Sequence, residues 1–292
     1  MPSERISVMK KGLLLLILAT FLWGGNYIAG AFLGPSLPAS LLNTIRWFIS
    51  TILLIGIMVI NNKPLYLFKK WKEFILLGFL GVFSFSTLNY IGLKHISSSQ
   101  AGMISAGIPV AILLLTPIFL KEKVHSKSWV GAIISIIGVF VLIIGKQTDS
   151  GENSMFGVAI IILSCFAWAL YTILGKRFGK EMDSLTMTTG AAFYGTLFSA
   201  LSCIGSVHEG SIHMDTTAWL CVIYVSTFAS VGAYLAWNAG VKIIGVGRSG
   251  PYINLLPVWT VVLGLILLHE QVSGITSLGG IIIFIGAILA SL

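Results

Sequence analysis

Arg46 is the residue of this chain best suited to binding chemistry in an apolar environment. It is the one formal charge inside a long apolar run, five residues past Leu41, and thus about 7 to 8 Å along a helix. An ionisable side chain at such a depth is a candidate for function, because hydrocarbon disfavours it. The guanidinium could pair with a substrate carboxylate. Alternatively it snorkels to the surface or binds a backbone carbonyl, and the sequence slightly favours such a structural role.

Aromatic and amide side chains within the apolar runs are further candidates, because small-molecule sites are mostly apolar with a few placed hydrogen-bonding groups. The set comprises Trp23, Asn26, Asn89, Tyr90, Gln100, Trp168, Tyr171, Trp237, Asn238, Tyr252 and Asn254. Aromatic belts at the membrane surface explain Tyr90, Gln100 and Trp237, near the ends of their runs, equally well. The deeper members favour a cavity, since buried amides need partners; they are Trp23, Asn26, Trp168, Tyr171 and Asn254.

Two prolines and two glutamates mark candidate hinges and helix ends. Pro109 and Pro257 lie deep in their runs, where each removes a helical hydrogen bond and frees a carbonyl one turn earlier. A hinge at a binding site and a simple packing kink both explain them. Glu122 and Glu270 follow the ends of two runs, where a carboxylate can accept from the N–H groups that open the following helix. We expect a structural role for these two.

Motifs for cofactors and metals are incomplete. The segment Gly245–Gly250 matches the G-x-G-x-x-G pattern of dinucleotide sites, but no strand precedes it. His269 and Glu270 begin the zinc motif H-E-x-x-H, but Ser273 stands where the second histidine belongs. We therefore expect no cofactor, no bound metal and no enzymatic activity. The cysteines lack C-x-x-C spacing and are expected to pack in the core: Cys165, Cys203 and Cys221.

The composition excludes most soluble proteins. Of the 292 residues 56% are hydrophobic and only 10% charged, against about 25% charged in soluble domains, and the mean hydropathy is +0.96. Disorder is excluded by the apolar content. A nucleic-acid-binding protein is not expected, because the 18 Lys and Arg are not concentrated on one segment.

Ten apolar runs are long enough for membrane-spanning helices, which need about 20 residues each. They are 13–32, 41–60, 74–92, 98–120, 128–145, 156–174, 184–205, 216–237, 249–268 and 275–291. The polar stretch 146–154 is a linker between two groups of five. We therefore predict an all-α membrane protein with ten transmembrane helices and no soluble domain.

The distribution of Lys and Arg predicts the orientation, since these residues are retained on the cytoplasmic side. With both termini cytoplasmic, the inner segments hold fifteen of the 18, the outer loops hold only Lys94 and Lys146, and Arg46 lies within a run. This also explains the net charge of +8. We expect a multi-pass protein of a cell membrane, a bacterial plasma membrane in particular, whose first run is retained as a helix.

The two halves of the chain repeat each other. At an offset of 148 residues Gly102 matches Gly250, Pro109 matches Pro257, and the match continues without a gap over about 47 residues. At an offset of 145 Trp23 matches Trp168. Each copy, 1–145 and 155–292, holds five runs, an odd number, so the copies cross the membrane in opposite directions. Such inverted five-helix repeats are typical of secondary transporters.

The repeated segments, LKHISSSQAGMISAGIPV and VKIIGVGRSGPYINLLPV with their preceding FLWGGNYI and FAWALYTI, resemble the two EamA domains of the drug/metabolite transporter superfamily. The resemblance covers nearly the whole chain. It implies a ten-helix transporter of small organic metabolites, often an exporter of amino acids or toxic compounds.

These observations together predict a secondary transporter that works by alternating access and exports an amino acid or related amphipathic compound. All acidic residues and histidines fall in loops or at run ends, so we expect a facilitator or exchanger without a buried proton relay. The alternative is a non-transporting membrane protein, either an intramembrane enzyme or a structural or sensory module. Small residues allow close helix contact, either internal or in a homodimer: Gly131, Ser135, Gly279, Gly280 and Gly286.

Overall fold

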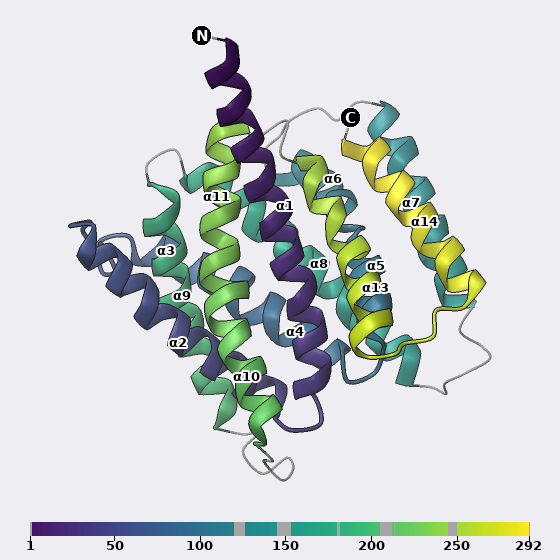
Figure 1. Cartoon of the computed structure of the whole chain (residues 1–292), viewed down its shortest axis with the longest axis horizontal. Helices are drawn as coiled ribbons and strands as arrows, with labels where there is room; N and C mark the ends of the chain where they lie inside the picture. Colours follow the sequence, from purple (N-terminus) through teal and green to yellow (C-terminus); the bar gives the residue numbers. More distant parts are fainter. Residues whose placement is uncertain are drawn as a thin grey trace.

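The computed structural model describes residues 2–119, 126–144, 153–179, 182–204, 212, 214–244 and 250–291. All regular secondary structure in these ranges is helical (Figure 1). The first half contains α1 (Pro2–Leu33), α2 (Ala39–Ile60), α3 (Trp71–Leu77), η1 (Gly78–Ser84), α4 (Phe85–Gly92), α5 (Ser98–Ser105), α6 (Ile108–Phe119) and α7 (Ser126–Ile144). The second contains α8 (Asn153–Phe178), α9 (Ser184–Cys203), α10 (Thr216–Tyr224), η2 (Val225–Gly232), α11 (Ala233–Ile244), η3 (Gly250–Leu255), α13 (Leu256–Leu267) and α14 (Gly274–Ser291).

Within the residues that the structure describes, every apolar run identified in the sequence is largely helical. Among these residues six stretches are both long and apolar enough to cross a membrane: Val8–Leu33, Ala39–Ile60, Trp71–Gly92, Ser98–Phe119, Met155–Gly175 and Thr216–Gly240. Three shorter apolar helices accompany them: Ser128–Val141, Tyr252–Leu267 and Gly274–Gly286. Large apolar side chains such as Phe48 and Ile137 are exposed on the outside of the bundle, as expected where lipid rather than water surrounds a protein.

Helix α9 belongs to neither group, because it is rich in hydroxyl side chains. Its Thr189 and Thr196 are buried, and each donates to a carbonyl one turn earlier in the helix. Their polar groups are therefore satisfied within the protein. One face of α9 packs against α2, where Thr51 Oγ1 and Thr196 Oγ1 are 3.2 Å apart and Asn43 Nδ2 donates to Ser199 Oγ at 2.9 Å.

Two long helical segments are interrupted by π-helices at matching positions. η1 separates α3 from α4, and η2 separates α10 from α11; the offset of 148 residues places Gly78–Ser84 within Val225–Gly232. A π-helix changes the hydrogen-bonding pattern of the backbone, and π-bulges are frequent at functional sites. The carbonyls of Val82 in η1 and Ala229 in η2 accept bonds from the side chains of Asn43 and Trp23.

The segments with the two repeated prolines are also broken. α5 ends at Ser105 and α6 begins at Ile108, so Pro109 is the second residue of the new helix. Likewise the 3-10 helix η3 precedes α13, in which Pro257 is the second residue. Proline fits the first turn of a helix, where its missing N–H costs nothing. Both prolines thus lie at changes of helix direction or type.

Helices α7 and α14 lie against each other at one side of the bundle (Figure 1). A Cβ on Gly138 would come within 2.6 Å of the backbone nitrogen of Ile283, and one on Gly286 within 2.7 Å of the carbonyl oxygen of Gly131. Ser135 Oγ donates to the Ile283 carbonyl at 3.0 Å. The small-residue stripe therefore forms an internal helix contact.

Candidate functional site

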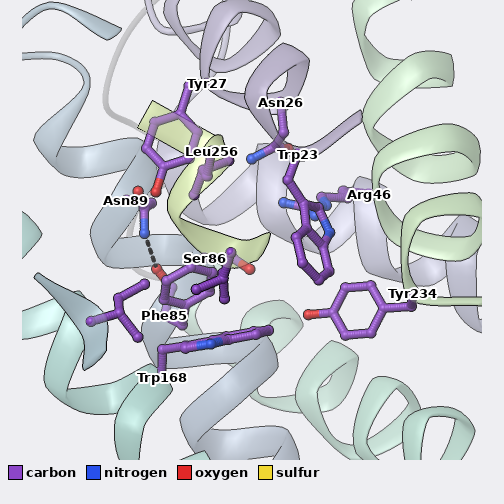
Figure 2. Close-up of a pocket in the computed structure, with 12 residues that line it drawn as sticks. Trp23, Asn26, Tyr27, Arg46, Phe85, Ser86, Asn89, Trp168, Tyr234 and Leu256 are labelled. Carbon is purple, nitrogen blue, oxygen red and sulfur yellow. Dashed lines mark hydrogen bonds between the residues drawn. The ribbon is translucent and has the colours of Figure 1, made fainter. Parts of the chain in front are cut away.

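A cavity at the centre of the bundle collects side chains from both halves of the chain. The volume of this cavity is about 40 Å³, enough for about three water molecules. α1, α2, α4, α6, α8, α11, η3 and α13 all contribute to its wall. The lining residues are Trp23, Asn26, Tyr27, Arg46, Phe85, Ser86, Asn89, Ile108, Trp168, Tyr234, Ile253 and Leu256 (Figure 2).

Arg46 supplies the positive charge of this wall. Arg46 is buried, with only 4% of its surface exposed. Its Nε donates to Ser230 Oγ at 2.7 Å, and its Nη1 donates to the Tyr90 hydroxyl at 2.9 Å. The guanidinium carbon also lies 5.1 Å from the centre of the Trp47 ring, a cation–π distance. Among the described residues no carboxylate pairs with Arg46. A buried cation without a counter-charge is a candidate anion site.

Amides connect this cation to the cavity. The Tyr90 hydroxyl, which accepts from Arg46, donates to Asn26 Oδ1 at 3.1 Å. Asn89 Nδ2 donates to the Phe85 carbonyl at 3.2 Å (Figure 2) and to Ser164 Oγ at 3.0 Å. The Oδ1 of Asn89 is buried and has no hydrogen-bond partner among the described residues. An unsatisfied acceptor at the cavity wall is available to a ligand donor or a water.

Aromatic rings enclose most of the remaining wall. The ring centres of Phe85 and Trp168 are 4.6 Å apart, and those of Trp23 and Tyr234 are 5.6 Å apart. Trp23 is fixed by a 3.1 Å bond from Nε1 to the Ala229 carbonyl of η2. In Figure 2 the Tyr234 hydroxyl points into the space between Trp23 and Trp168. The site thus combines flat apolar faces with one cation and a few amide and hydroxyl groups, an arrangement suited to a small amphipathic molecule.

Comparison with known proteins identifies the family. The sequence pattern of the EamA-like transporter family matches residues 10–144 and again 155–292. This chain belongs to the EamA-like transporter family. The match confirms the resemblance seen in the repeated segments. Together with the long apolar helices, it identifies this EamA-like transporter as an integral membrane protein.

Its relatives carry general names. The chain is 26% identical over 252 residues to "Uncharacterized transporter YetK" of Bacillus subtilis (strain 168), covering 85% of this chain and 76% of the relative. It is 27% identical over 285 residues to an "Uncharacterized transporter" of Archaeoglobus fulgidus, covering 95% and 97%. A solved structure, titled "Crystal structure of protein", shares the fold with a TM-score of 0.68 at 20% identity over 96% of both chains.

The structure brings most of the sequence candidates of this EamA-like transporter to one place. Five line the cavity: Trp23, Asn26, Arg46, Asn89 and Trp168. Three contact those directly: Tyr90 through Arg46, Tyr171 through Trp168 at 5.1 Å between ring centres, and Trp237 through Trp23 at 5.4 Å. Tyr90, Tyr171 and Trp237 therefore pack behind the lining residues and do not themselves line the cavity.

Four candidates have other surroundings. Gln100 forms a capping box with Ser97 at the start of α5, so its side chain serves the helix end. Asn254 is 2% exposed, and neither polar atom of its side-chain amide has a hydrogen-bond partner within the part of the chain that the structure describes. It lies next to the cavity residue Ile253 in sequence. Tyr252 in η3 and Asn238 in α11 are half-buried and outside the cavity lining.

Several lining residues were not expected from the sequence: Tyr27, Phe85, Ser86, Ile108, Tyr234, Ile253 and Leu256. Helical spacing could have found some of them, because residues three or four apart share a face. Tyr27 follows Trp23 by four residues and Ser86 precedes Asn89 by three. Tyr27 also joins the cavity to the helix break, since its hydroxyl lies 2.7 Å from Ser105 Oγ at the end of α5.

The glutamates differ from their expected roles in one respect. Glu270 does cap a helix, but it accepts from Ser98 and Ser99 of α5, not from the following α14. The reason is that the loop after α13 lies beside the start of α5, with Gly264 of α13 close to Ser99. Glu122 lies outside the described residues.

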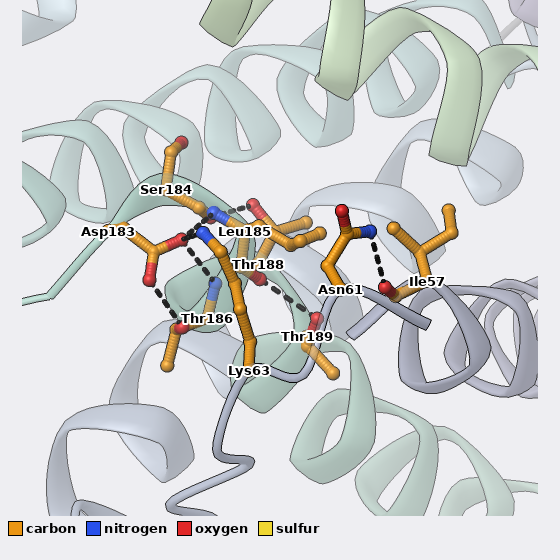
Figure 3. A network of polar contacts seen from close by, with 9 residues as sticks. All are labelled: Ile57, Asn61, Lys63, Asp183, Ser184, Leu185, Thr186, Thr188 and Thr189. Carbon is orange, nitrogen blue, oxygen red and sulfur yellow. Dashed lines mark hydrogen bonds and ion pairs between the residues drawn. The ribbon is translucent and has the colours of Figure 1, made fainter. Parts of the chain in front are cut away.

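A separate polar cluster joins the loop after α2 to the start of α9, away from the cavity (Figure 3). Lys63 Nζ lies 2.8 Å from Asp183 Oδ1, and Asp183 caps α9 through the N–H groups of Leu185 and Thr186. Partial burial raises the pKa of Asp183, but the hydrogen bonds from Lys63 and Thr186 outweigh it and hold the pKa below its usual value. This cluster fixes the start of α9 and does not contact the cavity.

Proposed function

We propose that this EamA-like transporter is a secondary carrier that moves a small organic metabolite across the plasma membrane by alternating access. The observation that carries the proposal is the central cavity, in which the buried Arg46, which pairs with no carboxylate of the described residues, lies among aromatic rings from both halves of the chain. Family membership supports transport in general. A membrane site that combines a cation with aromatic walls suits a ligand with an anionic head and an apolar body.

We propose further that ten helical segments cross the membrane as two inverted five-helix halves, 1–145 and 155–292. Equivalent residues of the two copies contact each other, as expected on a two-fold axis: Thr51 with Thr196, and Trp23 with Trp168 at 6.2 Å between ring centres. The paired helices run antiparallel, since Gly131 meets Gly286 while Gly138 lies by Gly279. An axis relating antiparallel helices is perpendicular to them and lies in the membrane plane.

The substrate we propose is an amino acid or a related amphipathic compound with a carboxylate. A guanidinium has five N–H donors, and the bonds from Arg46 to Ser230 and Tyr90 account for two N–H groups. A carboxylate would supply the missing counter-charge. The present cavity of about 40 Å³ holds only about three water molecules, so the carrier must open to admit such a molecule.

We propose export as the direction and a facilitator or exchanger as the mode of coupling. The lining of the cavity includes Arg46 and no acidic or histidine side chain among the residues described. Proton-driven carriers usually place such groups within the membrane. The excess of Lys and Arg in the inner segments favours cytoplasmic termini.

Counterflow in liposomes tests the proposal. Purified protein is reconstituted with an unlabelled compound inside, and radiolabelled amino acids and carboxylate-free analogues are offered outside. We expect saturable counterflow of compounds that carry a carboxylate. Chemically altered compound would instead indicate an intramembrane enzyme, and neither flux nor turnover would indicate a structural or sensory module. Uphill uptake driven by an imposed pH gradient and abolished by a protonophore would contradict the exchanger mode.

A further inference from the structure

Glu270, in the loop between α13 and α14, binds the first turn of α5 in the other half of the chain. Its Oε1 accepts from the backbone N–H of Ser98 at 2.8 Å and from Ser98 Oγ at 2.7 Å. Its Oε2 accepts from the backbone N–H of Ser99 at 3.0 Å and from the Ser99 hydroxyl. Both serines are fully buried. One carboxylate therefore engages four donors at the positive end of a helix.

The backbone ties this carboxylate to the end of α13. The Glu270 N–H donates to the Gly264 carbonyl at 3.1 Å, and His269 adopts a positive φ of 51°. This left-handed residue reverses the chain direction, so the loop folds back on the helix it has just left. Glu270 is thus held at a fixed place on α13 while it binds α5.

α5 and α13 approach closely along the length that leads to Glu270. A Cβ on Gly102 would lie 2.6 Å from Thr260 Cβ, and one on Gly264 would lie 2.6 Å from Ser99 Oγ. Only residues without a Cβ fit at these points. The two helices therefore form a tight antiparallel contact that ends at the Glu270 carboxylate.

We propose that Glu270 is a positioning residue that holds one end of the carrier closed. At the ends away from Glu270 both helices lead to the cavity: α5 is followed by α6, which begins with Ile108, α13 begins with Leu256, and Ile108 and Leu256 line the cavity. The loop of Glu270 lies at the end of the bundle opposite the chain termini (Figure 1). Opening the cavity toward this end separates α5 from α13 and breaks the four bonds of Glu270. The inference rests on the alternating-access carrier proposed above.

α5 packs closely on α13 at the end of the bundle where the Glu270 loop lies. This end is therefore the closed one in this conformation. It is the outer end in the orientation with cytoplasmic termini.

Thiol labelling of a cavity residue tests this role. Ile108→Cys, in a background without Cys165, Cys203 and Cys221, is exposed to a membrane-impermeant maleimide applied to the Glu270 side of membrane vesicles. We expect Glu270→Ala to raise the labelling rate by about tenfold, the effect of a 1.4 kcal/mol change in the closing equilibrium. Glu270→Gln should raise it less, because an amide keeps one acceptor oxygen.

Matched variants separate closure from helix capping. Asp215 caps α10 through a 2.7 Å bond from the Ala218 N–H without joining two helices, so Asp215→Ala should lower the unfolding temperature and leave the labelling rate unchanged. Gln271→Ala, an exposed change in the same loop, should alter neither. If Glu270→Ala remains folded and labels at the parental rate, Glu270 is a helix cap only and the proposal is overturned. Counterflow by the unaltered protein is measured separately, so failure of the carrier proposal appears there and not in the labelling rate.

Discussion

Replacing Arg46 by methionine separates a binding role from a structural one. In the folded protein the guanidinium gains two charge-assisted bonds, to Ser230 and Tyr90, each worth about 1.5 to 3 kcal/mol. Burying an ion without a counter-charge costs several kcal/mol. These terms nearly cancel. Both hydroxyls also keep other partners, since Ser230 donates to the Val225 carbonyl and Tyr90 to Asn26. We therefore expect Arg46→Met to change the free energy of unfolding by less than about 2 kcal/mol.

Substrate binding should respond far more strongly. Removing one partner of a buried, hydrogen-bonded charge pair costs about 2 to 5 kcal/mol, which corresponds to a loss of affinity of about 30-fold to several thousand-fold. The affinity is measured by isothermal titration calorimetry in detergent with the best substrate found in counterflow. The stability is measured by SDS-induced unfolding in mixed micelles. Arg177→Met, an exposed cation on α8, is the matched control and should leave both quantities unchanged.

Two results would refute the assignment of Arg46. A loss of more than about 3 kcal/mol of stability would show that the guanidinium is a structural cross-link, as expected when a removed residue leaves buried polar groups unpaired. Unchanged affinity for a carboxylate substrate in the folded variant would show that the anion binds elsewhere. A carboxylate-free analogue should bind the parent and Arg46→Met about equally.

Two further predictions concern stability. Gly286→Ala places a methyl group 2.7 Å from the Gly131 carbonyl oxygen and should destabilise the protein by about 1 to 3 kcal/mol. Gly56→Ala, which meets nothing within 4 Å, is the control and should be neutral or stabilising by up to about 1 kcal/mol. Equal effects of both changes in SDS unfolding would contradict the close contact between α7 and α14. The lowered pKa of Asp183 means that its contribution is complete above the unfolded pKa of about 3.9 and is lost as the pH falls through the folded pKa. Asp183→Asn should therefore lower stability at neutral pH and weaken the loss of stability on acidification, and an unchanged pH profile would show that the Lys63 cluster does not stabilise α9.

The helical fold could be predicted because its signal is local. A run of apolar residues of sufficient length has one stable form in lipid, since the backbone must satisfy its own hydrogen bonds there. The positions of Pro109 and Pro257 likewise predicted breaks near the helix centres. The two π-helices could not be predicted: Gly78–Ser84 and Val225–Gly232 contain no proline, and the change in register depends on partners from other helices, such as Trp23.

The cavity could be predicted only in part for a related reason. Trp23 and Trp168 stand out because bulky aromatics recur at matching positions of the two copies. Leu256 and Ile108 do not stand out, because a helix that is apolar on all sides does not show which side faces the interior. The contact between Glu270 and Ser99 could not be predicted either, because the two residues are 171 positions apart in sequence and no local pattern pairs them.

The alternating-access carrier that we propose would divide the contacts between the two halves into a constant and a changing set. The contact of α2 with η2 matches the contact of α9 with η1: Ser50 Oγ donates to the Ser226 carbonyl of η2 at 2.8 Å, and the equivalent Gly195 lies against Gly78 of η1, where a Cβ on Gly195 would be 2.9 Å from the Gly78 carbonyl oxygen. The α7 and α14 pair is equally reciprocal. Contacts that already obey the two-fold relation need not change when the halves exchange conformations. In the carrier that we propose, the Glu270 carboxylate belongs to the changing set, whereas the contact between Thr51 and Thr196 belongs to the constant set.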